Sequence, residues 1–442
     1  MYKFFSAEHS MFSAKVRSYF RFKYDQGDLG PGFEEILASP DLIRNLLQKK
    51  SGSPSLPQVE APDKTWLQDT TEIIDFCENA HNKTRVTPGL DTPRLRLTTF
   101  LIELLADEWV LVPACWERWQ YSLNGQMPNH RAFNEQQWGS FLLPEGSGRA
   151  RRDAGAQFFR KAFGIDDDKS SPRGPYGGLV DLGCVTETVD AWQASVKKLL
   201  DALEVHFSEH DYLLGGRPSL ADFSLLGPLY VHFYRDAVPG FVLRTGYPLV
   251  TEWIERTNAE SCLNSRRYGQ KYYGLDNAGE LIEKSVLSDR GDWLADDQVP
   301  TTLTPLIEIF FEEMWPYLLA SIEALRSFIA SDDHEPGAVL PRKSFTATPG
   351  FERFQRDGGA LTVAFRIGDI LSSRMVVPHQ IWRLQRIERA MRSTAPTSLE
   401  PWLAQFEQGA SILELSEKLE GCAIVKRGGL LYSDASQSSI NA

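Results

Sequence analysis

The chain has 442 residues, a formal net charge of −12 and 42% hydrophobic residues, including 11 Trp and 25 Phe. This length exceeds one ordinary core, so two or three domains are expected, and the apolar content suits a folded protein. The acidic balance argues against nucleic acid or an anionic membrane as the main partner, and we expect the basic cluster Arg149–Arg152 to be a solvated helix start.

The cysteines indicate free thiols. They are odd in number, scattered and never in C-x-x-C spacing, which favours a reducing compartment over a disulfide framework or a zinc site. They are Cys77, Cys115, Cys184, Cys262 and Cys422. No secretory signal is visible before Glu8, and no uncharged run is long enough to cross a bilayer. We expect a soluble, cytoplasmic protein with no membrane span and no bound metal.

The first residues predict a strand, a polar turn and a helix. Tyr2–Phe5 is an apolar run typical of a strand, and Ser13–Tyr24 has helical periodicity. Ser10 lies in the turn between them, where the helix start offers unpaired N–H groups and the positive end of the helix dipole. A thiolate is favoured in such a place, so Ser10 is a candidate hydrogen-bond donor to it. Alternatively, Ser10 and Ser13 only cap the helix.

The next elements are predicted in the order strand, helix, strand, strand, helix. Their ranges are Phe33–Leu37, Pro40–Lys49, 56–61, Thr65–Leu67 and a helix from Thr70 or Thr71 onward. The Ser/Gly/Pro segment 51–55 and the turn Pro62–Lys64 separate them. A proline, Pro57, opens the third predicted strand.

Three stretches resemble the glutathione S-transferase family, in the family's order. Residues 10–17 (SMFSAKVR) resemble its S-P-x-S-x-K-V-R helix start, and residues 56–59 (LPQV) resemble its V-P-V-L segment, whose proline is cis. Residues 67–76 (LQDTTEIIDF) resemble its L-x-E-S-x-A-I-x-x-Y stretch. Met11 for Pro, Leu56 for Val and Asp69–Thr70 for Glu–Ser are departures that keep the chemical type or the packing role. The resemblance implies an α/β thioredoxin-like, glutathione-binding N-terminal domain over residues 1–83.

The resemblance also implies glutathione as cosubstrate. Leu56, before the cis Pro57, would pair its backbone with the cysteinyl part of glutathione. Asp69 and Thr70 would bind the γ-glutamyl ammonium and carboxylate. Ser10 would hold the thiol as thiolate. In the plain structural interpretation Pro57 marks an edge strand and Thr70 is an N-cap.

Some assignments stay open at this stage. Ser6 and His9 are the alternatives to Ser10, and we expect His9 to be solvated. Gln48, Lys49 and Ser55 are candidates for the glycyl carboxylate of glutathione.

A linker is expected over His81–Pro93, and long helical periods begin at Arg96 and continue through Trp119. In the family the corresponding helix lines the electrophile pocket. The resemblance therefore implies Phe12, Trp109 and Trp116 as pocket residues. For any one of these aromatic side chains, ordinary bundle core is the alternative.

The following segment predicts a helical domain over residues 94–265. Helices are predicted over Arg152–Phe163 and Thr186–Phe207, and His206 and His210 at i, i+4 are expected to be surface residues rather than metal ligands. Ser219 and Asp222 form an S-x-x-D capping box within 212–230, which resembles the family's G-x-x-[ST]-x-A-D helix start. Tyr247–Arg256 resembles its closing helix. Together they imply the all-α glutathione-transferase C-terminal domain.

Residues 266–442 are an extension that ordinary family members lack, and we expect it to be mostly helical. Helices are predicted over Pro305–Ile329, Pro378–Met391 and Trp402–Leu419, a short strand over Leu361–Ile367, and a frayed tail from Ser433. No catalytic motif is present in it. We expect the extension to pack on the helical domain, covering the active-site mouth or a dimer surface.

The sequence thus predicts a homodimeric, serine-type glutathione transferase. The thiolate held near Ser10 would attack a hydrophobic electrophile, by conjugation, ether cleavage, dehalogenation or isomerisation. The alternative is a non-catalytic transferase-like binding or interaction protein. A thiol oxidoreductase ranks last, because such enzymes need a cysteine at the Ser10 position and no cysteine precedes Cys77.

Overall fold

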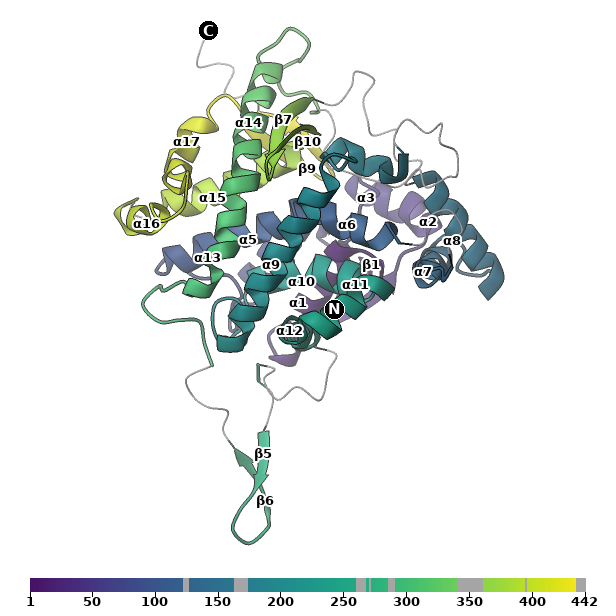
Figure 1. Cartoon of the computed structure of the whole chain (residues 1–442), viewed down its shortest axis with the longest axis vertical. Helices are drawn as coiled ribbons and strands as arrows, with labels where there is room; N and C mark the ends of the chain where they lie inside the picture. Colours follow the sequence, from purple (N-terminus) through teal and green to yellow (C-terminus); the bar gives the residue numbers. More distant parts are fainter. Residues whose placement is uncertain are drawn as a thin grey trace.

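A four-stranded sheet with its helices opens the chain (Figure 1). The computed structural model describes residues 1–121, 127–162, 174–259, 268–269, 272–284, 291–340, 361–393 and 396–434. The strands are β1 (Tyr2–Ser6), β2 (Phe33–Leu37), β3 (Gln58–Glu60) and β4 (Trp66–Gln68). The helices are α1 (Met11–Asp25), α2 (Pro40–Leu42), a π turn (Ile43–Leu47), α3 (Gln48–Ser51) and α4 (Thr70–Ala80).

The sheet has the order β2-β1-β3-β4. β1 is parallel to β2 and antiparallel to β3, and β3 is antiparallel to β4. Its centre is apolar, since the paired Phe4 and Val59 are fully buried. The predicted strand and helix order and the thioredoxin-like fold are confirmed.

The second part of the chain is all-helical. Its elements are α5 (Pro93–Glu108), α6 (Leu111–Trp119), α7 (Ala132–Leu142), α8 (Gly148–Ala162), a 3₁₀ segment (Gly174–Leu182), α9 (Val189–Glu209), α10 (Leu220–Pro228), a π segment (Leu229–Tyr234), α11 (Ala237–Gly246) and α12 (Pro248–Asn258). The single long period predicted from Arg96 to Trp119 is two helices. Pro113 has no N–H to donate to the carbonyl of Trp109, so the helical hydrogen bonding is interrupted between the end of α5 and the start of α6.

The extension is mostly helical, as predicted, with added hairpins. Its helices are a 3₁₀ turn (Thr301–Leu303), α13 (Thr304–Ile309), a π turn (Phe310–Met314), α14 (Trp315–Ile329), α15 (Pro378–Arg392), α16 (Pro396–Leu403), a 3₁₀ segment (Gly409–Glu414) and α17 (Leu415–Lys418). Its strands are β5 (Tyr272–Leu275), β6 (Leu281–Lys284), β7 (Thr362–Ile367), β8 (Ile370–Met375), β9 (Ile424–Arg427) and β10 (Leu430–Ser433). The expected strand at Leu361–Ile367 is β7, paired with β8.

Two predictions for the extension need correction. The π turn before Pro316 interrupts the helix predicted over Pro305–Ile329, because Pro316 cannot donate to the carbonyl one turn back. The single helix predicted over Trp402–Leu419 is wrong. Gln408 has φ of +60°, which ends helical geometry, and a 3₁₀ segment follows. The predicted tail from 435 onward lies outside the described residues.

One continuous apolar core joins all three parts of the chain. The same cluster of contacting buried residues includes Phe4, Leu104 and Trp315. In contrast, the β5–β6 hairpin projects away from the body of the molecule (Figure 1). All four described β6 residues are exposed.

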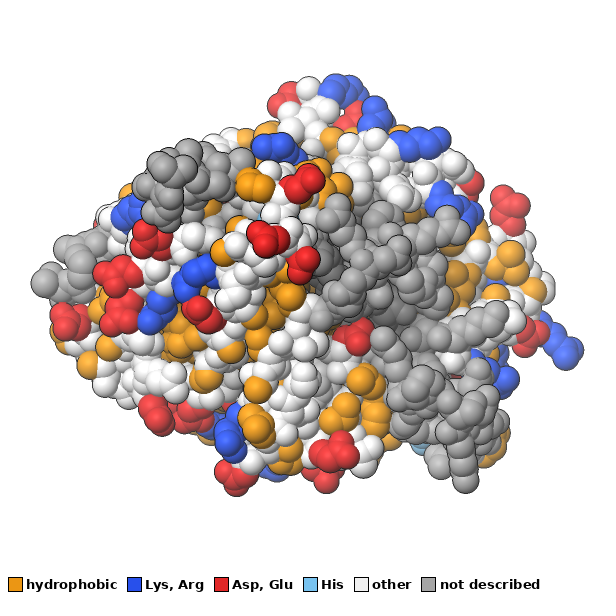
Figure 2. Space-filling view, turned by 90° about the horizontal axis from the view of Figure 1, so that it is seen from above, with side chains coloured by type: hydrophobic (Ala, Val, Ile, Leu, Met, Phe, Trp, Pro, Cys, Tyr) orange, Lys and Arg blue, Asp and Glu red, His pale blue; other side chains and the backbone are white. Residues whose placement is uncertain are grey.

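The surface carries positively and negatively charged side chains. Figure 2 shows Lys and Arg side chains scattered among Asp, Glu and hydrophobic side chains over one face of the molecule. Within the described part of the chain, the helices are too short or too polar to cross a membrane.

Candidate functional site

Three predicted binding stretches lie at one edge of the sheet. β3 is antiparallel to both β1 and β4, so β1 and β4 run in the same direction and end at the same edge. Gln58, the first residue of β3, pairs with Phe5 and with Gln68, near those two ends. The turn that carries Ser10, the segment before Gln58 and the start of α4 therefore all connect to this edge.

Ser10 is the N-cap of α1. Its backbone is extended (φ −97°, ψ 119°), and its Oγ accepts a hydrogen bond of 3.2 Å from the N–H of Ser13. The capping role is confirmed. Because this bond uses a lone pair of the hydroxyl oxygen, the O–H of Ser10 keeps its capacity to donate.

The two alternatives to Ser10 are occupied elsewhere. Ser6 is fully buried, and its Oγ donates to Glu35 Oε1 at 2.5 Å. His9, expected to be solvated, is buried, with its ring centroid 3.8 Å from that of Trp138. Burial, and next the Arg118 cation, hold the pKa of His9 well below its usual value. The prediction for His9 is therefore wrong.

The loop before β3 is fixed by Gln58. The Leu56–Pro57 peptide bond is cis, as the resemblance implied. Gln58 is fully buried, and its Nε2 donates to the carbonyls of Ser53 (2.8 Å) and Ser55 (3.1 Å). Through these two hydrogen bonds the polar side chain of Gln58 anchors the loop to β3.

The β4–α4 junction has a left-handed residue. Asp69 has φ of +103°, where a non-glycine residue costs about 1–3 kcal/mol. Its Oδ1 accepts from Thr71 N at 3.0 Å, so Asp69, and not Thr70, caps α4. Thr70 and Thr71 are buried. Among the candidates for the glycyl carboxylate, Lys49 and Ser55 are exposed and Gln48 is half-buried.

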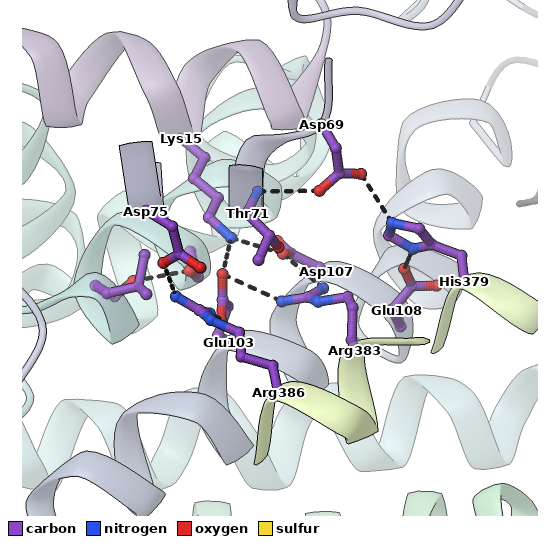
Figure 3. Close-up of polar contacts among 12 residues, drawn as sticks. Lys15, Asp69, Thr71, Asp75, Glu103, Asp107, Glu108, His379, Arg383 and Arg386 are labelled. Atoms are coloured by element: carbon purple, nitrogen blue, oxygen red, sulfur yellow. Dashed lines mark hydrogen bonds and ion pairs between the residues drawn. The ribbon is translucent and has the colours of Figure 1, made fainter. Parts of the chain in front are cut away.

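The extension reaches this same edge. In Figure 3 the ring of His379, the second residue of α15, lies between Asp69 and Glu108. Lys426 of β9 donates to the carbonyl of Gln68 at 2.7 Å and pairs with Glu72. The sequence predicted that the extension would cover an active-site mouth or a dimer surface. At this position it contacts Asp69, one of the predicted glutathione-binding residues, and the neighbouring Gln68 and Glu72.

His379 is held as a cation. Its Nε2 is 2.8 Å from Asp69 Oδ2 and its Nδ1 is 3.1 Å from Glu108 Oε1. Ionised carboxylates only accept, so both ring nitrogens must carry hydrogen. Burial opposes this charge, but Asp69 and Glu108 outweigh it and raise the pKa of His379. For Glu108, burial is likewise outweighed, chiefly by His379, and its pKa is lowered.

Next to His379 lies a buried cluster of ion pairs, shown in Figure 3. Lys15 of α1 contacts both Glu103 and Asp107 of α5 at 2.7 Å. Arg383 of α15 contacts the same two carboxylates at 3.2 and 2.9 Å. Arg386 adds a pair with Glu103 and a second one with Asp75 of α4. The cluster joins the first domain, the helical domain and the extension.

The acids of the cluster respond differently to their surroundings. Burial favours the neutral form of Glu103, but Lys15, Arg386 and Arg383 outweigh it and lower its pKa strongly. Burial dominates at Asp107 and raises its pKa. Glu103 is therefore the firmly ionised centre of the cluster.

The predicted pocket aromatics are mainly core residues. Trp109 is 1% exposed, donates to Glu313 Oε2 at 2.8 Å and stands 4.7 Å from Trp192, ring to ring. Trp116 is buried and stacks on Tyr176 at 4.7 Å. Neither forms an open pocket wall in this structure, because the helical domain and, for Trp109, the extension enclose them. Phe12 is partly buried against the core.

His206 also differs from its prediction. It is fully buried, with Nδ1 2.7 Å from Thr302 Oγ1 and Nε2 3.1 Å from the carbonyl of Tyr212. Burial lowers its pKa to about 3. Over the described residues, no group of three or more His, Cys, Asp or Glu side chains has a metal-holding arrangement.

Sequence reasoning missed the contribution of α15. Its signal was present: His379, Arg383 and Arg386 recur at helical spacing on one face, and Glu103 and Asp107 sit at i, i+4 inside an apolar helix. Charges at core-facing positions need partners, so the two sets could have been matched.

Comparison with known proteins agrees with this architecture. Residues 186–256 match the family model described as glutathione S-transferase, C-terminal domain. None of the curated proteins matches this chain. Residues 186–256, which span α9 to most of α12, are therefore a glutathione S-transferase C-terminal domain, and the predicted relationship to that family is confirmed.

The solved structures that are similar to this chain have low sequence identity to it. A β-etherase from Sphingobium sp. strain SYK-6 is 16% identical, with 60% of this chain and 98% of that chain covered and a TM-score of 0.37. A glutathione S-transferase from Rhodospirillum rubrum F11 is 14% identical (60% and 91% covered, TM-score 0.34). One from Methylobacterium radiotolerans JCM 2831, in complex with glutathione sulfonate, is 17% identical (60% and 94% covered, TM-score 0.34).

Proposed function

We propose that this chain is a glutathione transferase in which the Ser10 hydroxyl donates a hydrogen bond to the glutathione thiolate. The observation that carries the proposal is the common sheet edge of Ser10, Leu56–Pro57 and Asp69–Thr70. The family match over residues 186–256 supports the same class of activity.

The chemistry assigns one role to each residue. The backbone of Leu56 pairs with the cysteinyl part of glutathione, and the N-terminus of α4 with Thr70 receives the γ-glutamyl carboxylate. Asp69 receives the γ-glutamyl ammonium of glutathione. In the structure, the positively charged ring of His379 occupies this place beside Asp69. Because one cation stands where another is expected, glutathione and His379 compete for Asp69. The thiolate attacks an electrophilic carbon of an apolar substrate, and the leaving group departs with the bonding electrons.

The test measures glutathione binding by calorimetry and the thiol pKa of bound glutathione by ultraviolet absorbance. A hydrogen bond to a charged group is worth about 1.5–3 kcal/mol, so Ser10→Ala should raise that thiol pKa by about 1–2 units. Conjugation of aryl halides, β-aryl ethers and epoxides should slow in parallel. Ser10→Thr, which keeps the hydroxyl and the helix cap, is the matched control and should retain the low pKa.

Two results count against the proposal. Without glutathione binding at millimolar concentration, the chain would be a non-catalytic transferase-like binding or interaction protein. If Ser10→Ala left the thiol pKa unchanged, another group would activate the thiol. The electrophile, the homodimer and the cytoplasmic location stay predictions.

A further inference from the structure

Both carboxylate oxygens of Asp69 already have partners. Oδ1 accepts the hydrogen bond of 3.0 Å from the N–H of Thr71, and Oδ2 lies 2.8 Å from Nε2 of His379. The side chains of His379 and Asp69 are only 8% and 12% exposed. Because so little of this carboxylate faces solvent, a ligand ammonium reaches its Oδ2 atom only when the ring of His379 moves away (Figure 3).

The other carboxylate partner of His379 is also held by further groups. Glu108 Oε1 lies 3.1 Å from Nδ1 of His379, and Glu108 Oε2 accepts a hydrogen bond of 3.0 Å from Nε2 of Gln380. Burial acts to raise the pKa of Glu108, but His379 and then Arg383 and Gln380 outweigh it. Glu108 therefore keeps Gln380 and Arg383 when the ring of His379 leaves, so its charge is not stranded.

The charged and titratable groups around this contact come from several elements. The described neighbours of α15 include α5, α14 and β9. The groups next to His379, to its two carboxylates or to the adjoining Trp382 ring are Asp69 before α4, Glu108 of α5, Arg383 of α15, Arg374 of β8, Tyr317 of α14 and the Lys426–Glu72 pair of β9 and α4. Of these, Asp69 and Glu108 contact the ring nitrogens.

The charge on His379 rests on a balance that a ligand can change. Burial opposes an imidazolium, and so does the positive end of the helix dipole, because His379 is the second residue of α15. Asp69 and, less strongly, Glu108 outweigh burial and raise the pKa of His379. A ligand ammonium that replaces His379 beside Asp69 removes the larger attraction, so the displaced ring loses its proton near neutral pH.

We propose that His379, at the start of α15, is a pH-sensitive autoinhibitory contact of the glutathione site. The imidazolium occupies the place of the γ-glutamyl ammonium beside Asp69, and glutathione binds when it leaves. This inference rests on the proposed function, since it needs glutathione to bind at Asp69. A protein whose binding-competent state is only partly populated has a correspondingly reduced affinity. Glutathione therefore binds weakly at acidic pH and more tightly as His379 loses its proton.

The test is isothermal titration of the full-length protein with S-methylglutathione between about pH 5.5 and about pH 8.5, a range that spans the ordinary pKa of histidine. This ligand has the γ-glutamyl ammonium and both carboxylates of glutathione. It has no ionisable thiol, so Ser10 does not contribute to its pH dependence. The measured quantity is the Kd of wild type divided by the Kd of His379→Gln at each pH. In this ratio the titration of the ligand itself cancels.

The ratio should be roughly ten or more at acidic pH, which is the contribution of one charged hydrogen bond. Because the folded pKa of His379 is raised, the contact is complete below the ordinary value of about 6.5 and is lost as the pH rises through the folded value. The ratio should therefore stay constant below about pH 6.5 and fall toward one at alkaline pH.

Two controls isolate the ammonium of the ligand and the position of the charge. Glutaryl-S-methylcysteinylglycine is the same ligand without the amino group, so it should bind wild type and His379→Gln with equal affinity at every pH. Arg392→Gln removes a cation of α15 that pairs with Glu388. Since the ligand is net negative, losing that charge should weaken binding slightly, which is opposite to the effect of His379→Gln. Circular dichroism verifies that both variants are folded.

Wild type alone provides a check that needs no variant. From about pH 6 to about pH 7.5 its affinity for S-methylglutathione should rise, because His379 loses its proton over this range when a ligand displaces it. Its affinity for the glutaryl analogue should not rise.

Three results would overturn the inference. If neither wild type nor His379→Gln binds S-methylglutathione at millimolar concentration, the proposed glutathione site is itself wrong. If wild type binds it as tightly as His379→Gln or more tightly, the glutathione site stands, but His379 supports Asp69 and does not compete with the ligand. A ratio above one that does not vary with pH would mean that the contact is not sensitive to pH.

Discussion

At the scale of single residues, Asp222 is the clearest structural carboxylate. It accepts from Leu213 N (2.9 Å), from Ser219 N and Oγ (both 2.8 Å) and from Trp253 Nε1 (3.0 Å). The capping box predicted from S-x-x-D is confirmed, and the other two bonds tie α10 to the preceding loop and to α12. Asp222 is thus more than a helix cap.

We predict that Asp222→Ala lowers the free energy of unfolding by about 3–5 kcal/mol. A lost cap alone costs about 0.5–2 kcal/mol, and each buried donor left unpaired adds about 1–3 kcal/mol. Urea unfolding followed by circular dichroism measures the change. Glu414→Ala, at an exposed carboxylate paired with Lys418, is the control and should change stability by less than roughly 0.5 kcal/mol. A loss below 2 kcal/mol in Asp222→Ala would mean that it only caps α10.

His379 gives a prediction for how the stability of the protein depends on pH. Its pKa is raised in the folded state by Asp69 and Glu108, against burial. A raised pKa means that the folded state binds the proton more tightly. The stabilisation is therefore complete below the unfolded pKa of about 6.5, and it is lost as the pH rises through the higher folded value.

The free energy of unfolding of wild type and His379→Gln should thus differ most at acidic pH, and the difference should shrink toward alkaline pH. Urea titrations of both proteins across this range measure it. A difference that does not vary with pH would show that His379 is neutral in the folded protein.

At the scale of elements, α15 and α5 form the main seam between the extension and the rest of the chain. The buried carboxylates Glu103 and Asp107 face Arg383 and Lys15. A buried charge that loses its partner is costly, because no water replaces the lost contacts.

Removing one cation from this seam should destabilise the protein strongly. We expect Arg383→Met to cost about 3–5 kcal/mol of unfolding free energy, whereas Arg392→Met, on the exposed side of the same helix, should cost roughly 0.5 kcal/mol or less. Chemical denaturation of both variants provides the comparison. Similar values for the two would mean that the seam is held by its apolar contacts alone.

The first domain was predictable because its signals are local. The turn at Ser10, the cis Pro57 segment and the Asp69 helix start each lie within a few residues, and their order identifies the fold. The seam was less predictable, because Glu103 and Arg383 are far apart in sequence and only the folded chain brings them together. The β9–β10 hairpin also has a local signal, because Gly428 and Gly429 lie between two runs with apolar residues. From sequence, only a helix over Trp402–Leu419 was predicted in this part of the chain.

The pocket aromatics illustrate a different limit. An amphipathic pattern shows that Trp109 faces inward, but it does not tell an open pocket from a filled core. Here Tyr317 and Phe365 of the extension lie 5.9 and 6.1 Å from the Trp109 ring, centroid to centroid, so the extension fills the space beside it. The family resemblance contained no information on this point, since ordinary members lack the extension.

At the scale of the whole molecule, the extension shares one core with the other two parts. A shared core favours cooperative unfolding. We predict a single calorimetric transition whose van't Hoff enthalpy equals the measured enthalpy, with the extension unfolding together with the helical domain. Two separate transitions would instead identify residues 266–442 as an independent unit.

The position of α15 has a consequence for how the sheet edge behaves at different protein concentrations. Arg386 ties Asp75 of the first domain to Glu103 of the helical domain from within the same polypeptide. An intramolecular contact of this kind has a fixed effective concentration, set by the connecting chain. His379 lies on the same helix, so dilution of the protein leaves the fraction of molecules with the His379–Asp69 ion pair unchanged. A single molecule keeps this end of the sheet covered by α15 without a second copy.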